Sequence, residues 1–257
     1  MSSPKRLKID QLEVKVYLSK EEVGQAAAEY VADTLNDAIE KQGKATVILA
    51  TGASQFEFLD ALRSKSVDWS KITAFHLDEY KDMSIEHPAS FRKYLKERIL
   101  DEVNPAQVYF LLGDAADIKA EVERYEALLK QHEIDIACIG IGENGHLAFN
   151  DPPVADFNDP KLVKVVRLDE ACRRQQLGEG WFPTLDDVPT HALSLTLPAI
   201  LRCRTISCVV PDERKAKAVH DALYGEISTV CPASVLRRHD KTVLWLDEKA
   251  AGLIPTI

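Results

Sequence analysis

The chain has 257 residues, of which 46% are apolar, and its 41 acidic and 32 basic side chains give a formal net charge of −9. Nucleic acids and anionic membranes are bound by clustered Lys and Arg, so this charge argues against both as partners. A small anion held in one locally basic pocket is compatible with it.

The N-terminal segment 1–10 has no apolar core of a signal peptide, and no run approaches the roughly 18 apolar residues of a membrane span. The five cysteines are odd in number and lie mostly in apolar runs, which indicates reduced thiols in a cytoplasmic protein. No pair has metal-ligand spacing, so we expect no metal site.

Two hydrophobic periodicities alternate along the chain. Short apolar runs predict strands at 12–18, 46–50, 72–77, 107–112, 134–141, 161–168, 191–196, 205–210 and 242–246. Apolar residues at helical spacing predict helices at 20–42, 55–63, 89–102, 117–132, 169–176 and 213–223. The stretch 151–160, rich in Pro and Asp, predicts a surface loop.

This alternation predicts an α/β fold: one open, mostly parallel, doubly wound sheet with helices on both faces, Rossmann-like, in a single domain spanning 1–257. Ligands of such sheets bind at the carboxyl ends of the strands. Residues that follow a predicted strand are therefore the candidates for a functional site.

The first candidate is the turn Thr51-Gly52-Ala53-Ser54 between a strand and a helix. Gly52 permits close backbone approach, the two hydroxyls can donate hydrogen bonds, and the helix N-terminus favours an anion. An ordinary Gly-Ser turn with a helix cap explains the same residues equally well.

The second candidate is Asp78-Glu79-Tyr80, directly after the strand 72–77. A carboxylate at the end of an apolar strand is partly desolvated, which raises its pKa and suits a general base. Asp78 is the candidate base and Glu79 its structural partner, although either carboxylate could simply cap the next element.

The third candidate is the glycine-rich segment 140–152, where three glycines follow a buried strand and force a tight turn around His146. An imidazole there can move protons near neutral pH, and Asp151 could hold its tautomer. The glycine spacing differs from the G-x-G-x-x-G of dinucleotide sites, so a nucleotide is disfavoured.

A fourth feature is the cationic start of the helix 213–223, which indicates an anionic ligand unless it is a solvated charge run.

Together these segments resemble the glucosamine-6-phosphate deaminase (isomerase) family, which is related to the 6-phosphogluconolactonases. The resemblance runs from about Val16 to Ala251 and is most specific at Leu77-Asp78-Glu79-Tyr80 and at Gly140–Pro152. The deaminases typically read D-E-Y and G-x-G-x-[DN]-G-H-x-[AG]-F-N-E-P, whereas the lactonases read D-E-R and D-G-H-x-A-S-L-F-P. Tyr80, Phe149 and Asn150 follow the deaminase pattern.

The resemblance implies conversion of a 6-phosphorylated 2-amino-2-deoxy aldose to the 2-keto sugar phosphate and ammonia, without a cofactor or metal. His146 matches the base that opens the ring, with Asn144 and Asp151 as its partners, and Asp78 matches the base that moves a proton from C2 to C1. The phosphate-binding positions are matched by Thr51, Gly52, Ala53, Ser54 and Lys215.

Two departures from the family pattern bear on specificity. Asp151 stands where most deaminases have Glu. In the segment 172–182 the second arginine of the motif R-x-A-N-x-R-[FY]-F, a phosphate ligand in the family, falls at or near Gly180. Arg173 matches the first arginine, and we expect Arg174 or another cation to replace the second.

The leading prediction is thus an isomerase/deaminase of glucosamine 6-phosphate or a close relative such as its galacto epimer. We expect the protein to be cytoplasmic, and the sequence allows a homo-oligomer. The alternatives are a 6-phosphogluconolactonase-type hydrolase, disfavoured by Tyr80 and Phe149-Asn150, and a non-catalytic sugar-phosphate sensor. The sensor is disfavoured because no helix-turn-helix segment precedes the domain.

Overall fold

The computed structural model of the chain describes residues 3–255, so residues 1–2 and 256–257 of the expected domain lie outside the described part. The first helix, α1 (Lys20–Gln42), has the bounds that its apolar spacing predicts. Ser19 caps its start by accepting a hydrogen bond from the Glu22 amide at 3.3 Å, and Gly43 ends it in the left-handed conformation, with φ 78°.

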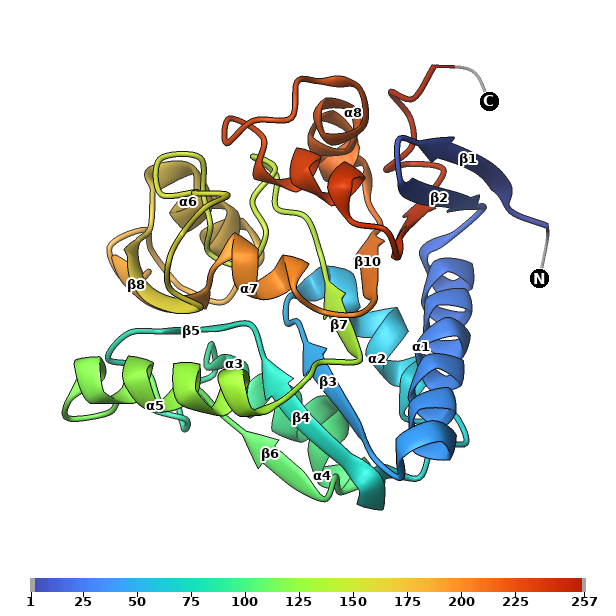
Figure 1. The fold of residues 1–257 in the computed structure, drawn as a ribbon. Helices are drawn as coiled ribbons and strands as arrows, with labels where there is room; N and C mark the ends of the chain where they lie inside the picture. Colours follow the sequence, from blue (N-terminus) through green and yellow to red (C-terminus); the bar gives the residue numbers. More distant parts are fainter. Residues whose placement is uncertain (1–2, 256–257) are drawn as a thin grey trace.

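The main sheet has eight strands in the order β1-β2-β11-β10-β7-β3-β4-β6 (Figure 1). Their bounds are β1 Lys5–Ile9, β2 Leu12–Tyr17, β3 Ala45–Leu49, β4 Ile72–His76, β6 Gln107–Tyr109, β7 Ile136–Ile139, β10 Ile206–Val210 and β11 Thr242–Asp247. Only β1, an edge strand, pairs antiparallel; the other neighbours are parallel. The predicted open, mostly parallel sheet is confirmed. The sequence did not predict β1, because its polar residues lack an apolar run.

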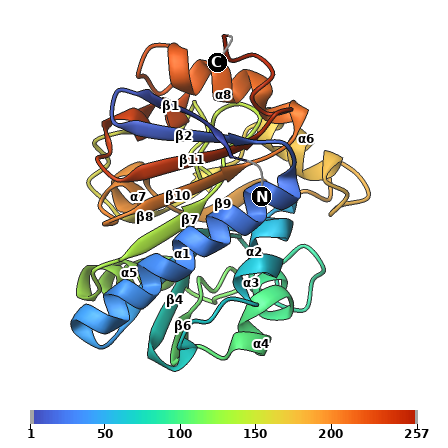
Figure 2. The same ribbon diagram turned by 90° about the vertical axis from the view of Figure 1, so that its right-hand side faces the viewer.

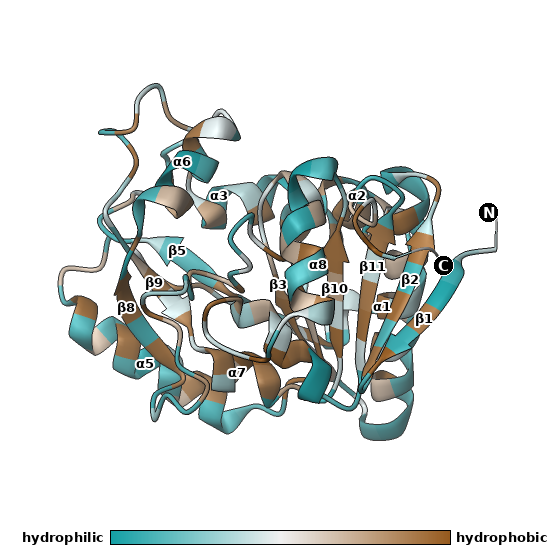
Figure 3. Ribbon diagram, turned by 90° about the horizontal axis from the view of Figure 1, so that it is seen from above, coloured by the Kyte–Doolittle hydropathy of each residue, from teal (hydrophilic) through white to brown (hydrophobic). Residues whose placement is uncertain are grey.

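Helices cover both faces of this sheet, as predicted (Figures 1 and 2). One face packs on α1 and α2 (Phe56–Leu62), and the other on α5 (Ile118–Gln131), α7 (Leu197–Leu201) and α8 (Ala216–Tyr224). Successive strand residues alternate between the two cores: Val47 and Leu49 belong to the first, Ile48 to the second. Hydrophobic residues accordingly run along the central strands in Figure 3, whereas the helices carry both hydrophobic and hydrophilic residues.

The expectation of one sheet holding every strand is corrected. A second sheet, β5-β9-β8, consists of β5 (Asp78–Tyr80), β9 (His191–Leu195) and β8 (Val163–Arg167), and it is antiparallel throughout. Strand β8 exposes part of its residues to solvent, as antiparallel strands with one open face do. The short apolar runs 161–168 and 191–196 predict strands but carry no information about which sheet they join.

The predicted helix 89–102 is interrupted by a π-helical turn. It consists of α3 (Phe91–Leu95), the π segment Lys96–Leu100 and α4 (Asp101–Val103). The helix 169–176 is α6 (Glu170–Gly178), which packs beside the second sheet (Figure 1). Within residues 3–255, no helix is both long and apolar enough to cross a bilayer.

Candidate active site

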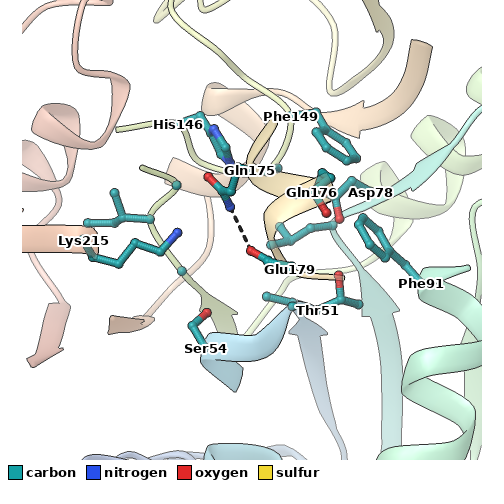
Figure 4. A pocket seen from close by; sticks show the side chains of 17 residues that line it. Thr51, Ser54, Asp78, Phe91, His146, Phe149, Gln175, Gln176, Glu179 and Lys215 are labelled. Atoms are coloured by element: carbon teal, nitrogen blue, oxygen red, sulfur yellow. Dashed lines mark hydrogen bonds between the residues drawn. The ribbon is translucent and has the colours of Figure 1, made fainter. Parts of the chain in front are cut away.

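A pocket lies at the carboxyl ends of β3, β4 and β7, with α6 on its other side (Figure 4). Six of the sequence-predicted residues line it: Thr51, Gly52, Ser54, Asp78, His146 and Lys215. Ala53 lines an adjoining pocket that shares Ser54 and Lys215 with the first. The position agrees with the rule that open α/β sheets bind ligands where their strands end.

The glycine-rich turn after β7 fits closely around the imidazole of His146. The Gly142 amide donates to the His146 carbonyl at 2.9 Å, and Gly145 adopts φ +84°. A Cβ atom on Gly142 would lie 2.1 Å from Cε1 of His146, so only glycine leaves room for the ring. The glycines therefore let a histidine fold back over its own turn and face the pocket (Figure 4).

Behind the ring, Asn144 and Asp151 bind the same nitrogen of His146. Its Nδ1 lies 2.7 Å from Asn144 Oδ1 and 2.9 Å from Asp151 Oδ1, and the Asn144 amide donates to Asp151 at 2.9 Å. Both neighbours of Nδ1 are acceptors, so Nδ1 carries the hydrogen and Nε2 keeps its lone pair. Burial acts to raise the pKa of Asp151, but the hydrogen bonds from His146 and Asn144 outweigh it and the pKa is lowered.

Asp78 and Glu79 are both buried but differ in their surroundings. Glu79 accepts hydrogen bonds from the Ser90 hydroxyl, the amides of Phe91 and Arg92, and Arg92 Nε. Asp78 instead lines the pocket, where burial and then the charge of Glu79 raise its pKa well above the usual range. A carboxylate with a raised pKa beside an open cavity suits proton transfer, so Asp78 fits the role of a base. Glu79 caps the start of α3 and is the structural partner of Asp78.

The ligand atoms of His146, Asp151 and Cys172 lie within 4.8 Å of one another, the spacing of a small metal site. Burial, and then the charge of Asp151, raises the pKa of the Cys172 thiol. A protonated thiol is a poor metal ligand, and Nδ1 of His146 already donates to two acceptors. These groups fit a hydrogen-bonded relay better than a metal.

The loop after β3 forms the other end of the pocket. Gly52 adopts φ 100°, a conformation that residues with a side chain rarely adopt. Its carbonyl accepts a 2.8 Å hydrogen bond from the Tyr94 hydroxyl of α3. Gln55 Nε2 donates to Ser54 Oγ at 3.1 Å and to the Val209 carbonyl of β10. The loop is thus tied to α3 and to the sheet.

Lys215 enters this end from the short 3₁₀ turn before α8. It is 5% exposed, and among residues 3–255 no carboxylate lies within 4.0 Å of its ammonium group. Burial lowers its pKa, and the charge of Glu179 acts in the opposite direction. A buried cation without a close carboxylate is available to an anionic ligand.

One face of α6 supplies the remaining polar groups. Cys172, Gln175, Gln176 and Glu179 recur at three- and four-residue spacing, which places them on one side of the helix. Gln176 accepts a 2.8 Å hydrogen bond from the Tyr80 hydroxyl, and Gln175 Nε2 donates to Glu179 at 3.1 Å. Both glutamines and Glu179 line the pocket, as Figure 4 shows.

The expectation that Arg173 and Arg174 bind the anion is wrong for this arrangement. Arg173 donates to the backbone carbonyls of Leu185 and Val188, and Arg174 is exposed and pairs with Glu170 at 2.8 Å. The two arginines lie between the positions that face the pocket, so the turn of α6 directs them away from it.

Sequence reasoning missed three supporting residues. Tyr94 holds the Gly52 carbonyl, Cys172 lies beside Asp151, and Phe91 lines the pocket. Only Cys172 left a signal in the sequence, because it stands at helical spacing from Gln175, Gln176 and Glu179. The others reach the site through the tertiary position of α3.

Known proteins resemble this chain over most of its length. Residues 18–245 match the family model of glucosamine-6-phosphate isomerases/6-phosphogluconolactonase. A glucosamine-6-phosphate deaminase of Exiguobacterium sibiricum is 39% identical over 209 residues, covering 81% of each chain, and one of Bacillus cereus strain B4264 is 32% identical, covering 94% of this chain and 89% of the relative.

Solved structures of related proteins have a similar fold. A monomeric glucosamine-6-phosphate deaminase superposes with a TM-score of 0.85 at 32% identity, covering 93% of this chain and 99% of that one. A 6-phosphogluconolactonase from Shewanella baltica shares the fold, with a TM-score of 0.77 at 19% identity over 94% and 99% of the two chains. The chain therefore belongs to the family of glucosamine-6-phosphate isomerases and 6-phosphogluconolactonases.

Proposed function

We propose that the protein is an aldose–ketose isomerase that deaminates glucosamine 6-phosphate or a closely related hexosamine 6-phosphate. The observation that carries this proposal is the pairing, across one pocket, of a buried carboxylate with a raised pKa, Asp78, and an imidazole, His146, whose Nδ1 is held by Asn144 and Asp151. An isomerase needs one group for ring opening and another for proton transfer between carbons.

Ring opening falls to His146 in this scheme. Its Nε2 takes the proton of the anomeric hydroxyl and, as an imidazolium, gives a proton to the ring oxygen, which yields the open-chain aldehyde. The resulting imidazolium is stabilised by Asp151, whose pKa is lowered and which therefore stays ionised.

Asp78 then moves the proton along the carbon chain. It removes the hydrogen of C2, and the electron pair forms the C1=C2 double bond while the carbonyl pair of C1 moves to O1, which takes a proton. The nitrogen lone pair then forms the C2=N bond as C1 takes the proton back from Asp78, and the nitrogen gives up one N–H proton, so the number of protons is unchanged. The product is an imine at C2, which water hydrolyses to the ketone and ammonia. Positioned acids and bases contribute about 10²–10⁴-fold each.

The far end of the substrate would lie against the loop Thr51–Ser54 and Lys215, where hydroxyls, backbone amides and one buried cation converge. Anchoring that end fixes C1 and C2 against Asp78 and converts binding energy into rate. The deaminases among its relatives, and the five free, buried cysteines, support a cytoplasmic location.

The test is an ammonia-release assay with glucosamine 6-phosphate, galactosamine 6-phosphate and 6-phosphogluconolactone, in which the ketose phosphate is quantified separately. We expect ammonia and ketose phosphate in equal amounts from a hexosamine phosphate. Lactone hydrolysis without ammonia release would replace the proposal with a hydrolase, and turnover of neither class would reject it.

A further inference from the structure

The anion end of the pocket contains a carboxylate, Glu179. A Cβ atom built on Gly52 would lie 3.8 Å from Glu179 Oε2, so this oxygen lies over the loop residue that is best suited to approach a ligand. Glu179 also exerts the largest charge effect on Lys215 of any side chain. Figure 4 shows the carboxylate between Thr51 and Gln175, on the side of the pocket that Lys215 enters.

Local structure holds Glu179 in this position. It is the C-cap residue of α6, and its backbone N–H donates to the Gln175 carbonyl, while Gly180 after it turns the chain with φ +84°. Its Oε1 accepts the hydrogen bond from Gln175 Nε2, and Gln175 Oε1 in turn accepts from the Glu143 amide at 2.9 Å. Because Gln175 is 9% exposed and fixed at both ends of its amide, Glu179 is a built part of the site.

The charges at this end do not suit a dianion. Among the described residues that line the pocket, Lys215 is the one Lys or Arg. The neighbouring Arg214 is occupied by Asp212 at 3.3 Å and lies 3.7 Å from Glu143. A phosphate monoester carries about −1.5 to −2 charges near neutral pH, so one cation would face both the phosphate and the carboxylate of Glu179.

We propose that Glu179 is a specificity-determining residue that weakens recognition of a phosphate at this end of the pocket. The enzyme then discriminates less sharply between a hexosamine 6-phosphate and the unphosphorylated hexosamine than it would without this carboxylate. The carboxylate offsets part of the positive charge of Lys215 from beyond salt-bridge distance, while hydroxyl groups of a sugar can donate to it. This inference rests on the proposed function for its substrate class.

The experiment compares the unmodified protein with Glu179→Gln, which keeps the oxygen that accepts from Gln175 and removes the charge. Glu170→Gln, at an exposed position on the same helix, is the matched control. The readouts are kcat/KM for ammonia release from glucosamine 6-phosphate and from glucosamine, and the Kd of inorganic phosphate by calorimetry.

In the unmodified protein we expect a higher kcat/KM for the phosphorylated sugar, because Lys215 still faces its far end. Glu179→Gln should raise the preference for the phosphorylated sugar and the affinity for inorganic phosphate, each on the order of tenfold, because the like charge is gone. Glu170→Gln should change neither by more than about twofold.

An unchanged phosphate preference, or unchanged or weaker binding of inorganic phosphate, in Glu179→Gln would overturn the inference. If Glu179→Gln folds poorly by circular dichroism, Glu179→Ser is measured in its place with the same expectations. Absence of ammonia release from every hexosamine would reject the proposed function alone, because the phosphate Kd values still decide the role of Glu179.

Discussion

Asp78 and Glu79 are adjacent in β5, yet Glu79 is surrounded by hydrogen-bond donors from α3 and Asp78 faces the pocket. Successive side chains of a strand point to opposite sides, so one strand can place a structural and a reactive carboxylate one residue apart. The two residues should therefore respond differently to the same chemical change.

Asp78→Asn is expected to lower kcat for ammonia release by about 10²–10⁴-fold, because the base is lost. The pKa of Asp78 is raised by burial, so the proton is lost only at a pH well above that of an ordinary Asp. Activity should fall on the acid side below this raised pKa, and pH–rate profiles of kcat/KM measure it.

The same residue sets a stability difference with a definite sign. A carboxyl group whose pKa is raised on folding stabilises the fold below its unfolded pKa and loses this contribution as pH rises through the folded value. Asp78→Asn should consequently gain Tm relative to the unmodified protein as the pH is increased. A constant Tm difference across the acid range would show that Asp78 is not desolvated.

Glu79→Gln should reduce stability. The substitution removes the charge that accepts from Arg92 and two backbone amides, and it leaves the buried guanidinium partly unpaired. Breaking a buried ion pair costs about 3–5 kcal/mol. Urea denaturation measures this loss; an unchanged midpoint would contradict the structural role of Glu79.

Asp151→Asn is expected to lower kcat on the order of 10⁴-fold, because the amide can donate to Nδ1 and favour the wrong tautomer of His146. Its pKa is lowered, so in the unmodified protein its contribution to stability is present above the unfolded pKa and is lost as pH falls through the folded value. Urea denaturation at several acidic pH values should show that the unmodified protein loses this stability as the pH falls and that Asp151→Asn does not.

Gly142→Ala should abolish turnover, because the new methyl group would lie 2.1 Å from Cε1 of His146 and displace the ring. Gly178→Ala is the control: a Cβ there meets nothing within 4 Å, and alanine stabilises a helix by up to about 1 kcal/mol over glycine. Steady-state rates and Tm values of both variants separate the two effects. Full activity in Gly142→Ala would show that the ring can move without consequence.

Arg173→Ala and Arg174→Ala should leave KM for glucosamine 6-phosphate within about twofold, because neither side chain lines the pocket. Arg173→Ala removes the donor to the Leu185 and Val188 carbonyls and should lower the unfolding free energy by about 1–3 kcal/mol. Arg174→Ala should be near neutral. A KM raised tenfold in either variant would return that arginine to the anion site.

Much of the architecture was predictable because the central strands are apolar on both faces and the helices are amphipathic. The bounds of α1 follow from its cap and its glycine stop. The separation of β5, β8 and β9 into a second sheet was not predictable, because strand pairing depends on contacts distant in sequence. The polar edge strand β1 gives no apolar signal at all.

The proton-transfer side of the site was easier to predict than the anion side. Asp78 and His146 follow buried strands, whose ends must converge at one edge of a parallel sheet. The motif matches Arg173 and leaves Arg174 or another cation to replace the missing arginine, but it does not contain the helical phase of α6 that turns both side chains away. Applying that phase to Cys172, Gln175, Gln176 and Glu179 would have identified the face directed at the pocket.

The short helix α3 connects both ends of the site. Its first turn is bound by Glu79, next to Asp78, and its Tyr94 hydroxyl holds the Gly52 carbonyl of the loop after β3. The strand that carries the proton-transfer carboxylate and the loop after β3 are consequently tied to the same short helix. A substitution that shifts α3 should therefore disturb the proton-transfer end and the anion end of the pocket together.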